Sequence, residues 1–454
     1  MQQNEEMEMI DGFFETIEDK SVEQAPEQNR VGRTEGSEEE TSDLSASFDG
    51  LVDLVLDNRG KLAFLVKEGG SLVMKAEHEV DGKLVIPPPA NQIIWKVPGG
   101  SEVARHWAQD TDSALFDDLV QYHSTISELP NDNHYRFVAA WVMHTYLVDK
   151  FEYSPIPWLH GIAERGKTRT GKGMIYASYR GVHVITLREA HLLRQAQDLK
   201  ATLFIDLKDL WKKAESAGVE DILLCRFEKG AKVPRVLYPS KGKFRDTVYF
   251  NVYGPTVVAT NEPVNEIFAS RTTPMIMPES ARQFGDDIKP EDGLPFRERL
   301  LAFRARWMDR DLPVVPKPCA GRLGDILRPL RQIVNVVCHD KGWFLNLVEG
   351  LEVKRKHVGA DSLDGQVVAA MVQVQESVVN SHLLNEVLLN AVNEKRSERE
   401  RITPQKLGKI IARLGFEKYT SGQQRGFYWE DELVERLCKR YGLIFCKEKA
   451  CQEP

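Results

Sequence analysis

The sequence predicts an α/β fold in which a parallel sheet is covered by helices. Between Ile156 and Thr260, short apolar runs rich in β-branched residues alternate with amphipathic helical segments, which is typical of such a sheet. The expected strands lie in PIPWLHG, GVHVITL, ATLFIDL and PTVVAT. The chain has 454 residues, of which 42% are hydrophobic, and is therefore long enough for about two to four domains with buried cores.

A small antiparallel sheet is expected before this region. From residue 48 to 95 the apolar and polar residues alternate between turn signals, as they do in hairpins. The turn signals are Asn58-Arg59-Gly60, Gly69-Gly70 and Asp81-Gly82. Helical periodicity follows in residues 113–129 and 134–151, and strand signals fade after about residue 280, where helical stretches include 295–308, 323–337, 364–379 and 382–396.

The charge of the chain is unevenly distributed. Its net charge of −8 would argue against a nucleic-acid-binding protein. However, residues 1–45 contain fourteen acidic and three basic residues, a net of −11, which leaves +3 for residues 46–454. This first segment also has few apolar residues to bury, so we expect it to be a disordered acidic tail on a mildly basic body. The six cysteines include no CxxC pair, and no run of about 18 apolar residues occurs, which together indicate a cytoplasmic protein without a membrane span.

One motif carries specific chemistry. The segment GIAERGKT is a complete G-x-x-x-x-G-K-[ST] phosphate-binding loop between an expected strand and an expected helix. Its glycines allow successive backbone N–H groups to face phosphates at the helix N-terminus. Lys167 would reach the β- and γ-phosphates, and the Thr168 hydroxyl would bind Mg²⁺, so we expect ATP and Mg²⁺ as cofactors. The residues expected to hold the nucleotide are Gly161, Glu164, Arg165, Gly166, Lys167 and Thr168.

A phosphate-binding loop needs an acidic partner on a neighbouring strand. Asp206 ends the apolar run of ATLFIDL and is the candidate for holding Mg²⁺; a helix-capping aspartate is the alternative. Many hydrolysing ATPases have a glutamate directly after this residue, but here the position is Leu207. Asp209 or Glu189 could substitute, and the sequence does not decide between them. ATP binding is therefore predicted more firmly than rapid hydrolysis.

Two further candidates for catalysis follow the expected strand PTVVAT. Asn261 could orient the attacking water and sense the γ-phosphate, although Asn before Glu-Pro also fits an ordinary turn. Arg271 lies where an arginine finger could reach the nucleotide of a neighbouring subunit, with a plain surface arginine as the alternative.

Basic residues gather in two places. The segment between Asp206 and Asn261 is expected to contain a basic β-hairpin that could grip DNA phosphates, although a solvated charged hairpin is the alternative. Residues 402–429, with a net charge of +4, show the helix and β-wing pattern of a winged helix, a module used for either DNA or protein contacts. The candidate DNA-binding residues are Lys229, Lys232, Arg235, Lys406, Lys409, Arg413 and Arg425.

Taken in order, GIAERGKT, LFID, FEKGAKVPRV, VVATNEP and the terminal module resemble ring ATPases carried by plasmids, phages and integrated elements. The stretch from about 106 to 445 is similar to the helicase half of phage- and poxvirus-type primase–helicases (superfamily 3) and to the minichromosome maintenance helicases of the AAA+ class. This resemblance implies an AAA+-like core that holds ATP between the subunits of a hexamer, with the hairpin in a central DNA channel. It also implies P-loop, Mg²⁺, sensor and finger roles for Lys167, Thr168, Asp206, Asn261 and Arg271. Nothing upstream resembles a primase.

These observations predict an ATP-dependent, helicase-like DNA motor that replicates a mobile element. Two alternatives remain: an ATP-controlled DNA-binding initiator or regulator that does not unwind processively, and a defence or signalling ATPase whose winged helix binds protein. The expected segments are an acidic tail (1–45), a β-rich domain (46–105), a helical linker domain (106–150), a P-loop ATPase core (151–280), a helical lid (281–360) and a winged helix (361–446).

Overall fold

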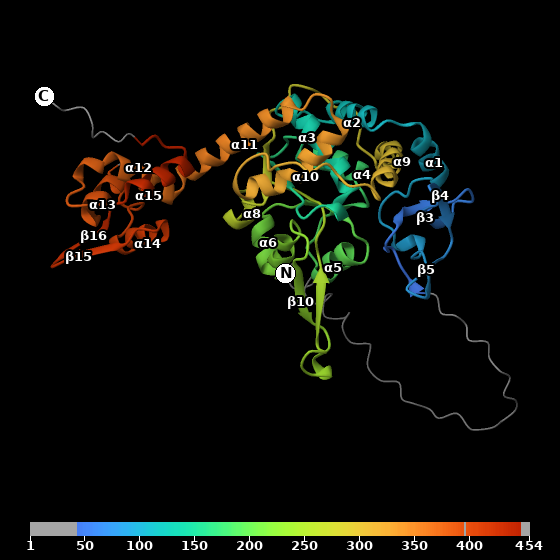
Figure 1. Ribbon diagram of the computed structural model, residues 1–454, viewed down its shortest axis with the longest axis horizontal. Helices are drawn as coiled ribbons and strands as arrows, with labels where there is room; N and C mark the ends of the chain where they lie inside the picture. The colour runs from blue at the N-terminus through green and yellow to red at the C-terminus, as the bar shows by residue number, and fades with distance from the viewer. Residues whose placement is uncertain (1–42, 395, 446–454) are drawn as a thin grey trace, which may run out of the picture. The chain divides into compact units, whose positions relative to one another are not determined.

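The computed structural model describes residues 43–394 and 396–445 (Figure 1). The predicted acidic tail lies outside the described residues except at its last three positions, where β1 (Asp43–Leu44) pairs with β6 (Lys83–Ile86). In the part of the chain described, no helix is long and apolar enough to cross a membrane.

The N-terminal region forms the predicted antiparallel hairpins, arranged as two small sheets. One sheet has the order β2-β3-β4 and the other the order β1-β6-β5. Their remaining strands are β2 (Leu51–Leu56), β3 (Leu62–Glu68), β4 (Ser71–Lys75) and β5 (His78–Val80). All three predicted turns are confirmed, because Gly60, Gly69 and Gly70, and Asp81 with Gly82 have positive φ between consecutive strands.

A five-stranded parallel sheet occupies the centre of the chain, as predicted. Its order is β13-β7-β12-β9-β8. The strands are β7 (Ile156–His160), β8 (Gly181–Val184), β9 (Thr202–Asp206), β12 (Thr256–Thr260) and β13 (Thr272–Ile276). The edge strand β13 was not predicted, and it contains Pro274, a residue that usually argues against a strand. At a sheet edge, however, the missing N–H removes no ladder bond.

Helices surround this sheet, and residues from Ala46 to Leu351 contribute to one hydrophobic core. The β-rich, linker, ATPase and lid segments therefore share that core. The helices of this region are α1 (Gly100–Gln109), α2 (Asp112–Ile126), α3 (Asp132–Thr145), α4 (Lys167–Ala177), α5 (Glu189–Gln197), α6 (Leu210–Ala217), α7 (Glu220–Cys225), α8 (Glu266–Ala269), α9 (Pro290–Trp307), α10 (Gly321–Val337) and α11 (Gly342–Asp361).

A buried ion pair joins the N-terminal strands to the region of the parallel sheet. Arg180, which precedes β8, donates from Nε to Asp53 of β2 at 2.6 Å and from Nη1 to the Leu199 carbonyl at 2.9 Å. Both charged side chains are almost fully buried. Removing either one would leave the other charge unpaired in the core, which is strongly destabilising.

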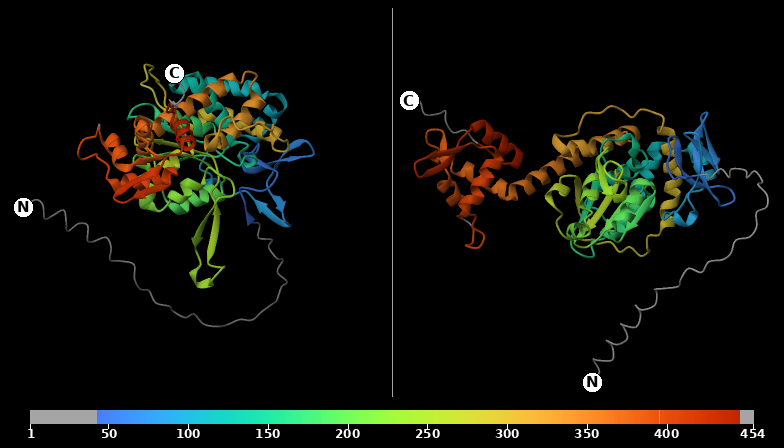
Figure 2. Two further views of the ribbon diagram at one scale, coloured as in Figure 1. Left: turned by 60° about the vertical axis from the view of Figure 1, so that its left-hand side comes forward. Right: turned by 90° about the horizontal axis from the view of Figure 1, so that it is seen from below.

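The predicted basic hairpin is present as β10 (Lys232–Val236) paired antiparallel with β11 (Thr247–Asn251). The hairpin projects away from the central sheet in Figure 1 and in the left view of Figure 2.

The C-terminal residues form a separate core of their own. A three-stranded antiparallel sheet of order β14-β16-β15 packs with helices. The elements are α12 (Leu363–Gln373), β14 (His382–Leu384), α13 (Asn385–Asn393), α14 (Pro404–Leu414), β15 (Lys418–Ser421), β16 (Gln424–Tyr428) and α15 (Asp431–Tyr441). The prediction that residues 382–396 form one helix was wrong at its start, because residues 382–384 pair with β16.

Candidate functional site

The glycine-rich loop joins the end of β7 to the start of α4, in the strand–loop–helix context that the motif requires. Gly161 and Gly166 have φ of 154° and 72°, and Glu164 is also left-handed, with φ of 65°. Gly166 is the N-cap of α4 and offers no side chain to its first N–H groups. These N–H groups and the helix dipole therefore form a cradle that suits an anion such as a phosphate.

Lys167 lies inside this loop. Its Nζ donates to the carbonyls of Gly161 and Ile162 at 2.8 and 2.5 Å, and the residue is only 8% exposed. Burial lowers the pKa of Lys167, while the negative charges of Asp206 and Glu262 act in the opposite direction. The ammonium group is thus held at the mouth of the anion cradle.

Thr168 and Asp206 are in direct contact. The Thr168 hydroxyl donates to Oδ2 of Asp206 at 2.5 Å, joining the first turn of α4 to the carboxyl end of β9. A hydroxyl and a carboxylate side by side next to a phosphate cradle are the oxygen ligands that Mg²⁺ uses together with a nucleotide. These two residues would hold the metal, which would neutralise charge on the phosphates.

Glycines inside α4 explain why this helix lies so close to the sheet. A Cβ on Gly171 would lie 2.0 Å from the Phe204 ring of β9, and a Cβ on Gly173 would lie 2.0 Å from Ile126 of α2. Gly171 and Gly173 are therefore packing features of the helix that carries Thr168.

Asn261 and Glu262 directly follow β12, the strand between β7 and β9. Asn261 is exposed at the carboxyl edge of the sheet, where ligands of parallel sheets bind. Glu262 was not among the predicted residues. Its Oε2 accepts hydrogen bonds from the Asp209 backbone N–H at 3.0 Å and from the Thr260 hydroxyl at 3.1 Å. Only its place next to a strand end could have suggested it in the sequence.

The remaining loop residues have other partners. Arg165 forms an ion pair with Glu279 at 2.7 Å, so its expected contact with nucleotide would come through its backbone N–H. The Glu164 side chain is exposed.

Arg271 directly precedes β13 and therefore lies at the amino edge of the sheet, opposite the edge that carries its own phosphate loop. Its guanidinium lies 4.8 Å from the centre of the Phe227 ring, and its Nε and Nη1 are buried without a hydrogen-bond partner among the described residues. Burial, followed by repulsion from Arg322, lowers its pKa. Arg322 itself donates to the Ser270 hydroxyl at 2.6 Å. Arg271 therefore has buried donors without a partner among the described residues and a second cation, Arg322, nearby.

The predicted DNA-binding residues divide into two groups. Three have partners: Arg235 pairs with Glu189 and Asp221, Arg413 pairs with Asp364, and Lys229 donates to the Asp149 carbonyl. The side chains of the others are exposed and form no ion pair within residues 43–394 and 396–445; they are Lys232, Lys406, Lys409 and Arg425.

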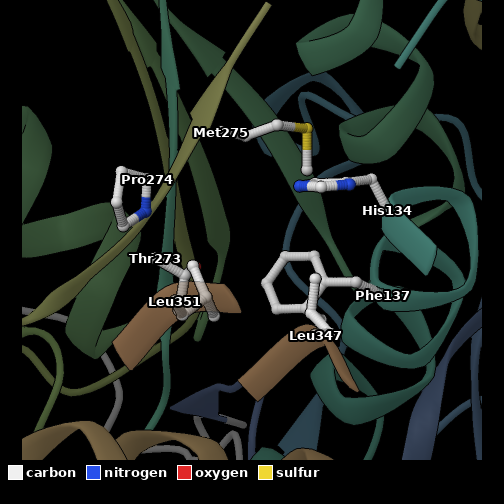
Figure 3. A pocket seen from close by; sticks show the side chains of 7 residues that line it. All are labelled: His134, Phe137, Thr273, Pro274, Met275, Leu347 and Leu351. Atoms are coloured by element: carbon white, nitrogen blue, oxygen red, sulfur yellow. The ribbon is translucent and has the colours of Figure 1, made fainter. Parts of the chain in front are cut away.

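A small apolar cavity lies between α3, β13 and α11 (Figure 3). Met275 and His134 point toward one another across it. Burial lowers the pKa of His134 to about 4, and its Nδ1 is 2.8 Å from the Asn131 side-chain oxygen. With its one titratable group neutral and partnered, this cavity is a packing gap without evident chemistry.

No protein-family model and no curated protein matches the chain. Among solved structures, it is similar to the C-terminal region of NrS-1, at 12% identity over 84% of this chain and 96% of that chain, with a TM-score of 0.36. SCCmec type IV Cch, described as an active helicase, is similar at 11% identity over 84% of this chain and 80% of that chain, with a TM-score of 0.32. A full-length MCM homologue from Methanopyrus kandleri is similar at 15% identity over 64% and 73%, with a TM-score of 0.35. Scores this low carry no weight by themselves, so the function is inferred from the chain's own residues.

Proposed function

We propose that this protein is an ATP-dependent motor of the helicase type, which moves along DNA as a ring of identical subunits. The observation that carries the proposal is the contact between Thr168 and Asp206 beside the phosphate cradle. It supports Mg²⁺–ATP binding, because it joins the metal-binding hydroxyl of the loop to the acidic end of a neighbouring strand. Lys167 would bind the phosphates, and Asn261 would sense the γ-phosphate.

The hairpin supports DNA as the partner. Its loop carries the exposed basic residues Lys241, Lys243 and Arg245, and Phe244 among them is 99% exposed. Tyr238 and Tyr249 are also exposed, at 45% and 62%. Basic residues interleaved with aromatic ones suit single-stranded nucleic acid, because the cations neutralise phosphates while the rings stack on bases.

The C-terminal module supports a second DNA contact. Its order of α12, β14, α13, α14 and the β15–β16 hairpin is consistent with a winged helix, in which α14 would be the recognition helix. Lys406 and Lys409 are exposed on α14, and Arg425 is exposed on β16. A role in replicating a plasmid, phage or integrated element is the further part of this proposal, and its support is the sequence resemblance alone.

Strand displacement tests the proposal. With ATP and Mg²⁺, the full chain should separate a forked DNA duplex, and Lys167→Ala should abolish this separation because the phosphates lose their cation. Duplex binding without any separation by the wild-type chain would reject the motor. That result would instead favour an ATP-controlled DNA-binding initiator or regulator, the alternative that the missing glutamate after Asp206 supports.

A further inference from the structure

Hydrolysis of ATP requires a group that accepts the proton of the attacking water. In this chain Leu207 occupies the position after Asp206, where a glutamate would be expected to do this. If the proposed function holds, on which this inference rests, another carboxylate must act in place of that glutamate. The structure narrows the candidates.

One of the two candidates named from the sequence already has a cationic partner. Glu189 on α5 accepts a hydrogen bond from the Arg235 guanidinium, which also pairs with Asp221 at 2.9 Å. A carboxylate neutralised in this way is poorly suited to take up a proton. Asp209 lies in the loop between β9 and α6, and its backbone N–H donates to Glu262.

Glu262 lies much closer to the metal-binding pair than its position in the sequence suggests. Asp206 is paired in register with Ala259, so Thr260 is the next residue along β12 toward the carboxyl edge. The Glu262 side chain folds back toward this strand end, since its carboxylate accepts from the Thr260 hydroxyl.

The same carboxylate also spans the gap between two strand ends. Its bond from the Asp209 N–H fixes it to the loop after β9, and its bond from Thr260 fixes it to β12. Both bonds go to Oε2, so neither of these two donors occupies the other oxygen. The group is therefore held between the carboxyl ends of β9 and β12, and it forms no ion pair with the residues that the structure describes.

Electrostatic coupling agrees with this placement. Glu262 is one of two carboxylates whose charge acts on Lys167, the other being Asp206. The hydrogen bond from the Asp209 N–H is the largest cause that lowers the pKa of Glu262, which keeps the group ionised at neutral pH.

We propose that Glu262 is the carboxylate that activates the attacking water, in place of the absent glutamate after Asp206. The water oxygen attacks the γ-phosphorus while the bond from that phosphorus to the β–γ bridging oxygen breaks. Glu262 takes the proton that the water loses and then releases it to solvent, so ATP and water give ADP, inorganic phosphate and a proton.

Glu262→Gln tests this role. The amide keeps an oxygen that can accept from Asp209 and Thr260 but cannot take up a proton, so folding and nucleotide binding should be retained. We expect DNA-stimulated ATP turnover to fall by about 100-fold or more, the usual contribution of a general base. Affinity for ATP, measured with a fluorescent ATP analogue, should stay within about threefold of wild type, since about 0.65 kcal/mol corresponds to a factor of three.

Glu266→Gln is the matched control, because Glu266 is an exposed glutamate four residues along the chain, and this variant should turn over ATP like wild type. Turnover by Glu262→Gln close to the wild-type rate would overturn the inference and leave the motor intact. Loss of turnover in Asp209→Asn with retention in Glu262→Gln would assign the role to Asp209 and overturn it as well. A wild-type chain that turns over no ATP would reject both the inference and the proposed function.

Discussion

Thr168 and Asp206 are 38 residues apart in the sequence, and their side chains meet because a phosphate loop and a neighbouring strand end share one edge of a parallel sheet. Contacts of this kind are predictable, since the motif is local and the carboxyl ends of parallel strands meet at the same edge. Glu262 was not predictable in the same way. Its role depends on a side chain that folds back on Thr260 and receives the Asp209 N–H, and no pattern of residue types specifies this.

A buried histidine should make the stability of the protein depend on pH. His123 on α2 is fully buried, and both of its ring nitrogens lack a hydrogen-bond partner among the described residues. Burial lowers its pKa from 6.5 to about 3. Between these values the unfolded chain binds the proton and the folded chain does not, so stability falls as the pH drops below about 6.5.

We expect His123→Leu to lose this part of the pH dependence, about 1.4 kcal/mol per pH unit in the free energy of unfolding. Urea unfolding of both proteins at pH 8 and pH 5 measures it. If wild type and His123→Leu lose the same free energy of unfolding between pH 8 and pH 5, His123 is not the source of this pH dependence.

At the scale of elements, the close approach of α4 to β9 depends on a residue without a side chain. An alanine Cβ at position 171 would lie 2.0 Å from the ring of Phe204, which is fully buried and has no room to move. We expect Gly171→Ala to destabilise the protein by about 1–3 kcal/mol, the usual effect of overpacking a core.

Gly350 in α11 is the matched control. Nothing lies within 4 Å of a Cβ at this position, so Gly350→Ala should be neutral or stabilising by up to about 1 kcal/mol through helix propensity. Chemical denaturation of the two variants compares them directly, and equal effects would contradict the packing argument.

The basic and the aromatic residues of the hairpin should contribute to DNA binding in two different ways that can be measured separately. A plot of log affinity for single-stranded DNA against log salt concentration has a negative slope. Replacing Lys241, Lys243 and Arg245 by glutamine should make this slope shallower by about 0.7 for each phosphate that the hairpin no longer neutralises. Phe244→Ala should instead weaken binding by about 1–3 kcal/mol with the slope unchanged. Titrations with a labelled oligonucleotide at several salt concentrations measure both.

Lys212→Gln with Lys213→Gln, two exposed lysines on α6, serves as the control for general charge. If this control makes the salt dependence of DNA affinity as shallow as the hairpin variant does, the hairpin has no special role in binding DNA.

Two elements show where sequence patterns mislead. The edge strand β13 contains a proline that is tolerated there, so its composition resembles that of a loop. In β14, the residues His382–Leu384 continue the periodicity of the following helix, and only their pairing with β16 makes them a strand. The other four strands of the parallel sheet, the hairpin turns and α14 were predictable because their apolar runs, glycines and caps are local. Thr403, for example, is the N-cap of α14 and its side chain accepts from the Lys406 N–H.

At the scale of the whole molecule, a role for Arg271 as an arginine finger would require a second copy of the chain. It lies at the amino end of β13, a five-residue strand, whereas the phosphate loop follows the carboxyl end of the adjacent β7. Five residues of strand span about 16 Å, so the guanidinium and its own phosphate site lie at opposite edges of the sheet. An arginine that acts on ATP from there would do so in a neighbouring subunit.

Mixing inactive variants tests this arrangement. We expect Lys167→Ala and Arg271→Ala each to abolish ATP turnover alone, and their mixture to recover part of it. Recovery would arise where an intact Arg271 of one subunit faces an intact loop of another. Lys167→Ala mixed with the Lys167→Ala, Arg271→Ala double variant should recover nothing. If the first mixture also stays inactive, Arg271 does not act between subunits.

The central claim is that the loop around Lys167 binds ATP whose hydrolysis is coupled to DNA. Turnover of ATP by the full chain, measured with and without single-stranded DNA, tests this claim most directly. We expect turnover that requires Mg²⁺, rises when DNA is added and falls by about 100-fold or more in Lys167→Ala, because a cation that stabilises the transition state is removed. Turnover that is the same in wild type and Lys167→Ala, or that DNA leaves unchanged, would contradict it.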